Sequence, residues 1–295
     1  MIVEPEPPID FYSSPYLAEH YDLICEAEQD YYRDVDTFWK LLQQQMLASR
    51  PSTEPIYVVD VGTGTGRVLN SLGDRARSSQ FDLSKVDFVG TDPSQYMLDR
   101  AAQCCSLSHV GRVSWRCGSA TSLLETLPSR EGAVDLLIFA DGGIAHLIQP
   151  GHGERFFASV ADLLRPRTGR ACIAVTNFEE AAKSLKYNDD SGTPQERASK
   201  QFANVIYRNA YLGTSVTGSR TETKYHFEVI RRLPGAEDEV ITAHQTVLKG
   251  KIWTEEELVS LIEGSGLFLV EIDARDPLQT FYHLARKDSS VIFRE

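Results

Sequence analysis

The sequence lacks the features of membrane proteins, secreted proteins and nucleic-acid-binding proteins. No uninterrupted apolar run reaches the roughly 18 residues of a membrane-spanning helix, and the acidic, proline-rich residues 1–10 lack the basic and apolar parts of a secretion signal. The five cysteines show no C-x-x-C spacing, which argues against a disulfide framework or a zinc site. Basic side chains are also scarce: 30 stand against 42 acidic ones, and the net charge of −12 repels phosphate backbones and anionic lipid. We therefore expect a cytoplasmic protein that holds no metal and has neither nucleic acid nor a membrane as its partner.

The residues that are present are typical of a folded globular protein. Hydrophobic residues make up 42% and charged residues 24% of the 295 residues, which is enough apolar material for a large core. After residue 55, short apolar runs alternate with helical periodicities, and this alternation predicts an α/β fold with a parallel sheet covered by helices on both faces. The expected strands are 56–61, 86–91, 113–117, 134–140 and 170–176.

The segments before and after this alternating region have different sequence patterns. Residues 1–10 are predicted to be a flexible leader because their prolines oppose regular structure. After residue 177 the alternation stops, and residues 178–212 have a polar, helical pattern. Residues 215–250 alternate around Pro234-Gly235, which predicts an antiparallel hairpin. Thr254-x-x-Glu257 is then the capping box of a last helix.

The most informative segment joins the first expected strand to the following helix. Gly62, Gly64 and Gly66 allow a tight turn and a close approach of the backbone to a ligand, whereas the alternative is a strand-to-helix turn with no ligand. A dinucleotide-binding loop would place its third glycine one residue later, at Arg67. No P-loop lysine follows either.

The run Val-Asp-Val-Gly-Thr-Gly-Thr-Gly, residues 59–66, instead resembles motif I of the class I methyltransferases that use S-adenosylmethionine (SAM). Asp92 ends the second strand where these enzymes carry an acid that accepts hydrogen bonds from both ribose hydroxyls, a task that suits a carboxylate. The alternative is that Asp92 only N-caps the next helix, with Pro93 at its first position. Gly118-Ser119-Ala120 resembles the family's G-D-A segment beside the adenine, with Ser119 in place of the acid.

This resemblance implies a doubly wound, Rossmann-like, seven-stranded and mostly parallel sheet, with SAM as the cofactor. The methyltransferase domain is expected to comprise residues 11–177 and 251–295. The cofactor-binding residues that the resemblance implies are Asp60, Gly62, Thr63, Gly64, Gly66, Asp92, Pro93, Met97, Ser119, Ala120, Ala140 and Asp141.

The loop after the fourth strand, residues 141–147, resembles the G-N-S-x-A-H-L segment of glycine and aminosugar N-methyltransferases. These relatives carry an insertion after their fifth strand, so residues 178–250 are expected to form a small α+β lid over the acceptor. His146 would act as a base or orient the acceptor, or it would simply bond to the backbone. Asp141 would attract a cationic amine or N-cap a helix, and Tyr21 would close over the cofactor or belong to the core.

Three more side chains are expected beside the acceptor. They are Asn177, which could instead end a strand, and His226 and His244, which could instead face solvent. The expected reaction is methyl transfer from SAM to a small molecule, at nitrogen in preference to oxygen. The alternatives are an O-methyltransferase, a SAM-binding regulator and a rearrangement catalyst on the same fold. The acceptor, the number of transfers, the use of a base and the choice between monomer and homodimer stay open.

Overall fold

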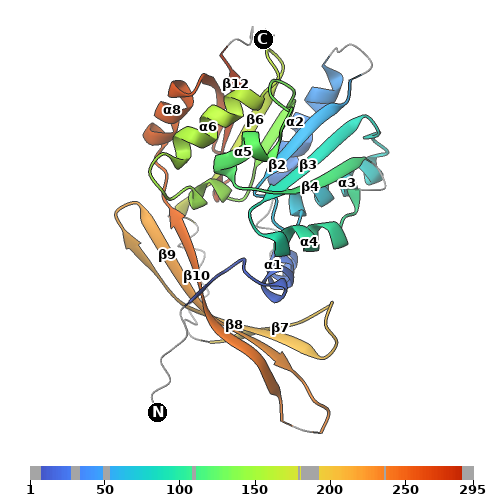
Figure 1. The fold of residues 1–295 in the computed structure, drawn as a ribbon, viewed down its shortest axis with the longest axis vertical. Coiled ribbons are helices and arrows are strands. Elements are labelled where there is room, and N and C mark those ends of the chain that lie inside the picture. The colour runs from blue at the N-terminus through green and yellow to red at the C-terminus, as the bar shows by residue number, and fades with distance from the viewer. Residues whose placement is uncertain are drawn as a thin grey trace.

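The structure is a computed structural model and describes residues 8–27, 34–48, 54–107, 111–178, 180, 193–235 and 237–287. Two sheets dominate it, and a helix lies between them (Figure 1). None of the helices in these ranges is long and apolar enough to cross a membrane.

The larger sheet has seven strands in the order β11-β12-β6-β5-β2-β3-β4. Strand β12 runs antiparallel to both of its neighbours, and the remaining pairs are parallel. The mostly parallel, seven-stranded α/β fold is therefore confirmed. The strands are β2 (Ile56–Val61), β3 (Val86–Asp92), β4 (Arg112–Cys117), β5 (Leu136–Phe139), β6 (Arg170–Thr176), β11 (Leu267–Asp273) and β12 (Gln279–Arg286).

Strand β5 shows why this sheet needs helices on both faces. All four of its residues are buried, and they alternate between two separate cores. Leu137 and Phe139 pack with α6 (His152–Leu163) and α8 (Glu255–Gly264), whereas Leu136 and Ile138 pack with α2 (Asp34–Leu47) and α3 (Arg67–Ser79). The strand is shorter than the expected 134–140. Val134 forms only an isolated bridge, and the main chain turns at Ala140 toward the short helix η3 (Gly143–His146).

The smaller sheet has five strands in the order β1-β10-β9-β8-β7; we call it the lid sheet. Its strands are β1 (Ile9–Asp10), β7 (Gln195–Ala198), β8 (Val205–Thr217), β9 (Arg220–Arg231) and β10 (Glu239–Lys251). The hairpin around Pro234-Gly235 is confirmed, because β9 and β10 pair antiparallel on either side of it.

Two predictions about the lid sheet are wrong. The expected helical stretch 178–212 is wrong from residue 195 onward, where it contains β7 and the first half of β8. Phe178 and Glu180 are helical, and residues 179 and 181–192 lie outside the described residues. Val205 and Tyr207 project onto one face of β8 and pack with Val229 of β9, and this pairing overrides the local pattern. Ile9 and Asp10 of the expected flexible leader instead pair with β10, and residues 1–7 lie outside the described residues.

Helix α1 (Pro15–Ala27) joins the two sheets. Leu17 and Leu23 pack on the lid sheet. The buried carboxylate of Glu19 accepts hydrogen bonds from the backbone of Lys200 and Gln201 and from the hydroxyl of Tyr207. On its other side, α1 pairs Asp22 with Arg100 of α4 (Gln95–Gln103) at 2.6 Å. Helix α1 is therefore one of the elements that fasten the lid sheet to the parallel sheet.

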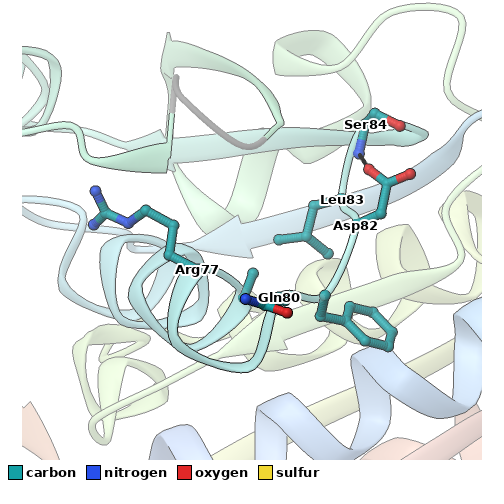
Figure 2. Close-up of a pocket in the computed structure, with 7 residues that line it drawn as sticks. Arg77, Gln80, Asp82, Leu83 and Ser84 are labelled. Carbon is teal, nitrogen blue, oxygen red and sulfur yellow. Dashed lines mark hydrogen bonds between the residues drawn. The ribbon is translucent and has the colours of Figure 1, made fainter.

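A shallow cavity of about 320 Å³ lies at the amino end of the parallel strands, away from the lid sheet (Figure 2). It is lined where α3 ends and the chain turns toward the amino end of β3, and its lining includes Arg77, Gln80 and Asp82. The carboxylate of Asp82 already accepts a hydrogen bond from the amide of Ser84 at 2.8 Å. This cavity is separated by the length of β3 from the glycine-rich loop.

Candidate active site

The glycine-rich loop follows β2 at the carboxyl edge of the parallel sheet. Gly62, Gly64 and Gly66 have φ values of +61°, +55° and +82°, in the left-handed region that favours glycine. A Cβ atom on Gly66 would lie 3.0 Å from the ring of Trp115. Thr63 donates its amide hydrogen to Thr91 of the neighbouring strand at 2.9 Å. The backbone is thereby held in a conformation that a side chain would strain.

Asp92 lies directly against this loop. One carboxylate oxygen accepts from the amide of Gly64 at 3.0 Å and the other from the amide of Ser94 at 2.8 Å. Each oxygen keeps a lone pair for a further donor, such as a hydroxyl. Burial raises the pKa of Asp92 to about 6. Ser94, not Asp92, is the N-cap of α4, since its hydroxyl accepts from Met97, so a capping role for Asp92 is wrong.

Asp60 is the penultimate residue of β2, close to the glycine-rich loop, and is buried. Its Oδ2 accepts from the hydroxyl of Thr63 at 2.7 Å, but its Oδ1, equally buried, has no hydrogen-bond partner. Burial raises the pKa of Asp60 to about 7. A buried acceptor without a donor is costly, and the ammonium group of a SAM molecule is a donor of the required kind. The residues present therefore fit the cofactor.

The other predicted cofactor residues lie along the same edge. The amide of Gly118 donates to the backbone carbonyl of Asp92 at 3.0 Å, so the segment after β4 lies beside the end of β3. Ser119 caps the short helix η2 (Ala120–Ser122) by accepting from Thr121 at 3.2 Å. Met97 is buried in α4, Pro93 precedes its cap, and Ala140 and Asp141 follow β5. Together with the glycine-rich loop after β2, these residues lie at the carboxyl ends of four adjacent strands, β5, β2, β3 and β4, where ligands bind in open α/β sheets.

Asp141 and Tyr21 meet at the exit of β5. The hydroxyl of Tyr21, carried by α1, donates to Asp141 at 3.0 Å. Asp141 has a φ of +50°, and the N-cap of η3 is Gly142, so Asp141 does not cap that helix. A Cβ atom on Gly142 would collide with the hydroxyl of Thr176 of β6, which fixes the close approach of this loop to the sheet.

His146 lies at the end of η3, against the lid sheet. Its Nδ1 is 3.0 Å from the carbonyl oxygen of Lys249 in β10. Because a carbonyl can only accept, Nδ1 carries the hydrogen, and Nε2 of the neutral ring is left as an acceptor. Solvent reaches the ring, but the surrounding protein lowers the pKa of His146 and favours the neutral form. The predicted backbone bond and the predicted base are thus compatible, since they use different nitrogens.

The remaining predicted residues are more dispersed. Asn177 is exposed at the end of β6, where its side chain accepts from the amide of Glu180 at 3.4 Å. His244 lies opposite Phe227 in the lid sheet, on the face that packs on α1. His226 adjoins Phe227 in β9 and therefore projects from the other face, where it contacts Glu228 at 3.1 Å. The structure does not bring His226 to the face that packs on α1.

Sequence reasoning missed Tyr12. Its hydroxyl lies 3.4 Å from Nε2 of His146, and its ring meets that of Tyr21 edge-on at 6.4 Å. Tyr12 precedes the part of the chain that resembles known methyltransferases, and no spacing links it to His146. The adjacent aromatic pair Phe11-Tyr12 is the one local feature of the sequence that suggests this segment packs against other apolar residues.

Comparisons with known proteins agree with this geometry. The family model described as "Methyltransferase domain" matches residues 58–167. The N-methyltransferase FrzE of Cladobotryum sp. is 32% identical over 237 residues, which cover 79% of this chain and 81% of that protein. In fold, the chain is similar to an S-adenosylmethionine-dependent methyltransferase from Clostridium acetobutylicum, with a TM-score of 0.62, 14% identity and coverage of 92% and 98% of the two chains. It is also similar to the sugar N-methyltransferase KedS8 from a Streptoalloteichus species, with a TM-score of 0.60, 13% identity and coverage of 90% and 92%. The chain therefore belongs to the family of SAM-dependent methyltransferases.

Proposed function

We propose that the protein transfers the methyl group of SAM to the nitrogen of a small-molecule amine. The observation that carries this proposal is the arrangement after β5, where a carboxylate, Asp141, and a neutral imidazole, His146, lie within one short loop beside the glycine-rich turn. The relationship to an N-methyltransferase supports the same acceptor class.

The carboxyl edge of the parallel sheet would hold the cofactor. Asp92 would accept the ribose hydroxyls, Asp60 would accept from the amino-acid end, and the segment at Ser119 and Ala120 would adjoin the adenine. SAM supplies an activated methyl group and its own leaving group, so the protein mainly has to orient the two reactants. Orientation of this kind lowers a barrier by about 7–11 kcal/mol in favourable cases.

The acceptor would lie beside Asp141 and His146, next to the contact between η3 and the lid sheet. Most amines are cationic at neutral pH, and Asp141, fixed by Tyr21 at 3.0 Å, would attract that charge. Nε2 of His146 would then take one proton, which frees the nitrogen lone pair to attack the methyl carbon. In that attack the N–C bond would form as the C–S bond breaks, and His146 would release the proton to solvent. Asn177 and His244 stay candidates for further contacts with the acceptor.

A labelled-methyl screen tests this proposal. The purified protein is incubated with SAM that carries a deuterated methyl group and with separate panels of amines, phenols and carboxylic acids, and the products are analysed by mass spectrometry. We expect label on nitrogen, and less of it with the Asp92→Ala variant at a SAM concentration near the wild-type Kd, as the control for cofactor binding. Label only on oxygen would overturn the amine assignment and leave the family assignment untouched.

A further inference from the structure

The N-terminal segment reaches the site from the lid sheet. Ile9 and Asp10 pair in parallel with Thr246 and Val247 of β10. The carboxylate of Asp10 accepts from the amide of Tyr12 at 2.9 Å, which turns the chain out of the sheet. This turn directs Tyr12 away from the lid sheet and toward η3.

Tyr12 makes contacts in two directions. Its hydroxyl is 3.4 Å from Nε2 of His146, and the two rings meet edge-on at 5.6 Å and 83°. Its carbonyl accepts from the hydroxyl of Ser94 at 2.7 Å, and the amide of Ser94 binds Asp92. One residue thus connects the imidazole at the acceptor side with the carboxylate at the cofactor side.

The direction of the Tyr12–His146 contact follows from the other ring nitrogen. Nδ1 donates to Lys249, so Nε2 of the neutral ring must accept, and the hydroxyl of Tyr12 must donate. Burial raises the pKa of Tyr12 far above its usual range, so this hydroxyl keeps its hydrogen. The ring of His146 is then held at both nitrogens and cannot flip without losing both bonds.

We propose that Tyr12 is a positioning residue that holds His146 in the orientation and tautomer of a base. This rests on the role given to His146 in the proposed function. Hydrogen bonding to the neutral form of a base lowers its pKa. Of the charged groups near the ring, Asp10 acts in the opposite direction and favours the protonated form. The hydroxyl of Tyr12 therefore offsets Asp10 and keeps Nε2 unprotonated at neutral pH until the acceptor amine displaces this hydroxyl and donates to Nε2 itself.

Nitrogen-detected NMR of histidine-labelled full-length protein tests this without any acceptor. The resonance of His146 is assigned from its loss in His146→Gln. In the wild type we expect the tautomer with hydrogen on Nδ1. In Tyr12→Phe, which keeps the ring and the main-chain carbonyl, we expect the pKa of His146 to rise by about half a unit to one unit, as for one net hydrogen bond. Tyr16→Phe is the matched control, because the ring of Tyr16 packs against Phe202 and Tyr207 and not against His146.

Two results would overturn the proposal. One is an unchanged pKa and an unchanged Nε2 shift in Tyr12→Phe. The other is read from the wild type once the resonance is assigned: hydrogen on Nε2 of the neutral ring would leave the hydroxyl of Tyr12 no acceptor there, so a poorly folded Tyr12→Phe variant does not affect this result. Calorimetry with S-adenosylhomocysteine is expected to give the same affinity for Tyr12→Phe and the wild type. Since no acceptor is used, the proposal can fail while amines are methylated, and amine methylation can fail while the His146–Tyr12 bond is observed.

Discussion

The two sheets of this protein are built in opposite ways. The strands of the parallel sheet have four to eight residues, and β5 is buried along its whole length. The main strands of the lid sheet have 12 or 13 residues and alternate between more and less buried side chains. In the parallel sheet, side chains can meet a ligand only where strands end. In the lid sheet, side chains along the whole length of the strands can contact neighbouring elements such as α1 and η3.

This difference assigns cofactor binding to the parallel sheet and acceptor chemistry to the contact between the two sheets. Asp60 and Asp92 lie at strand ends, where the backbone of the glycine-rich loop fixes their positions. His146 and Tyr12 gain their orientations from the lid sheet, through Lys249 and through β1. We therefore expect substitutions in the parallel sheet to change cofactor binding. Substitutions at the contact between the two sheets should change the chemistry of the acceptor.

His146→Gln should give the largest effect and is the strongest test of this division. Glutamine can retain a bond to the carbonyl of Lys249 but cannot accept a proton, so kcat with the amine identified in the screen should fall by about 10²–10⁴-fold. The affinity for S-adenosylhomocysteine, measured by calorimetry, should stay within twofold of the wild type. If kcat were retained, the acceptor would not need a base at His146.

Asp92→Ala should affect the other side of the division. Loss of two charged hydrogen-bond acceptors predicts a loss of about 1–3 kcal/mol in cofactor affinity, or about 5- to 150-fold in Kd by calorimetry. Asp87→Ala is the matched control, because Asp87 lies at the far end of the same strand and pairs with Arg112. Equal losses in both variants would show a general weakening of β3, and unchanged affinity would remove Asp92 from the site.

The two sheets also differ in how far the sequence predicts them. The parallel sheet follows from local signals, since continuous apolar runs give its strands and the spacing of three glycines gives its loop. The sequence predicts helix for the first half of β8, because the alternation of that segment is meaningful only when it pairs with β9. Tyr12 and Glu19 were missed because their partners, His146 and Tyr207, lie 134 and 188 positions away. Nothing in one sequence indicates such distant pairs.

Tyr207→Phe should weaken the attachment of the lid sheet. The hydroxyl of Tyr207 donates to the buried carboxylate of Glu19 at 2.6 Å, and a hydrogen bond to a charged group contributes about 1.5–3 kcal/mol. We expect a loss near the lower end in the free energy of unfolding by urea, because Glu19 keeps its backbone donors. Tyr211→Phe, which loses a bond from the same strand to Thr214 at 3.0 Å, should cost less. A larger loss in Tyr211→Phe would contradict the role of α1 as the attachment.

The smallest expected effect is a pH dependence of cofactor binding, which belongs to the parallel sheet alone. Burial raises the pKa of Asp60 to about 7, so the ligand-free carboxyl becomes protonated as the pH falls through 7. A cationic ammonium group binds the ionised form better. Binding should therefore release a proton, and affinity should fall by up to about tenfold between pH 8 and pH 6, since each pKa unit corresponds to 1.36 kcal/mol.

Asp60→Asn separates this titration from that of Asp92. Without the carboxyl at residue 60, affinity should be weaker than in the wild type at pH 8 and nearly constant down to about pH 7. A decline below that pH should persist, because the pKa of Asp92 is raised only to about 6. His146→Gln should keep the wild-type pH dependence, since His146 belongs to the acceptor side. If His146→Gln abolished the dependence instead, the two sides of the site would be coupled electrostatically, and cofactor binding could not be assigned to the parallel sheet alone.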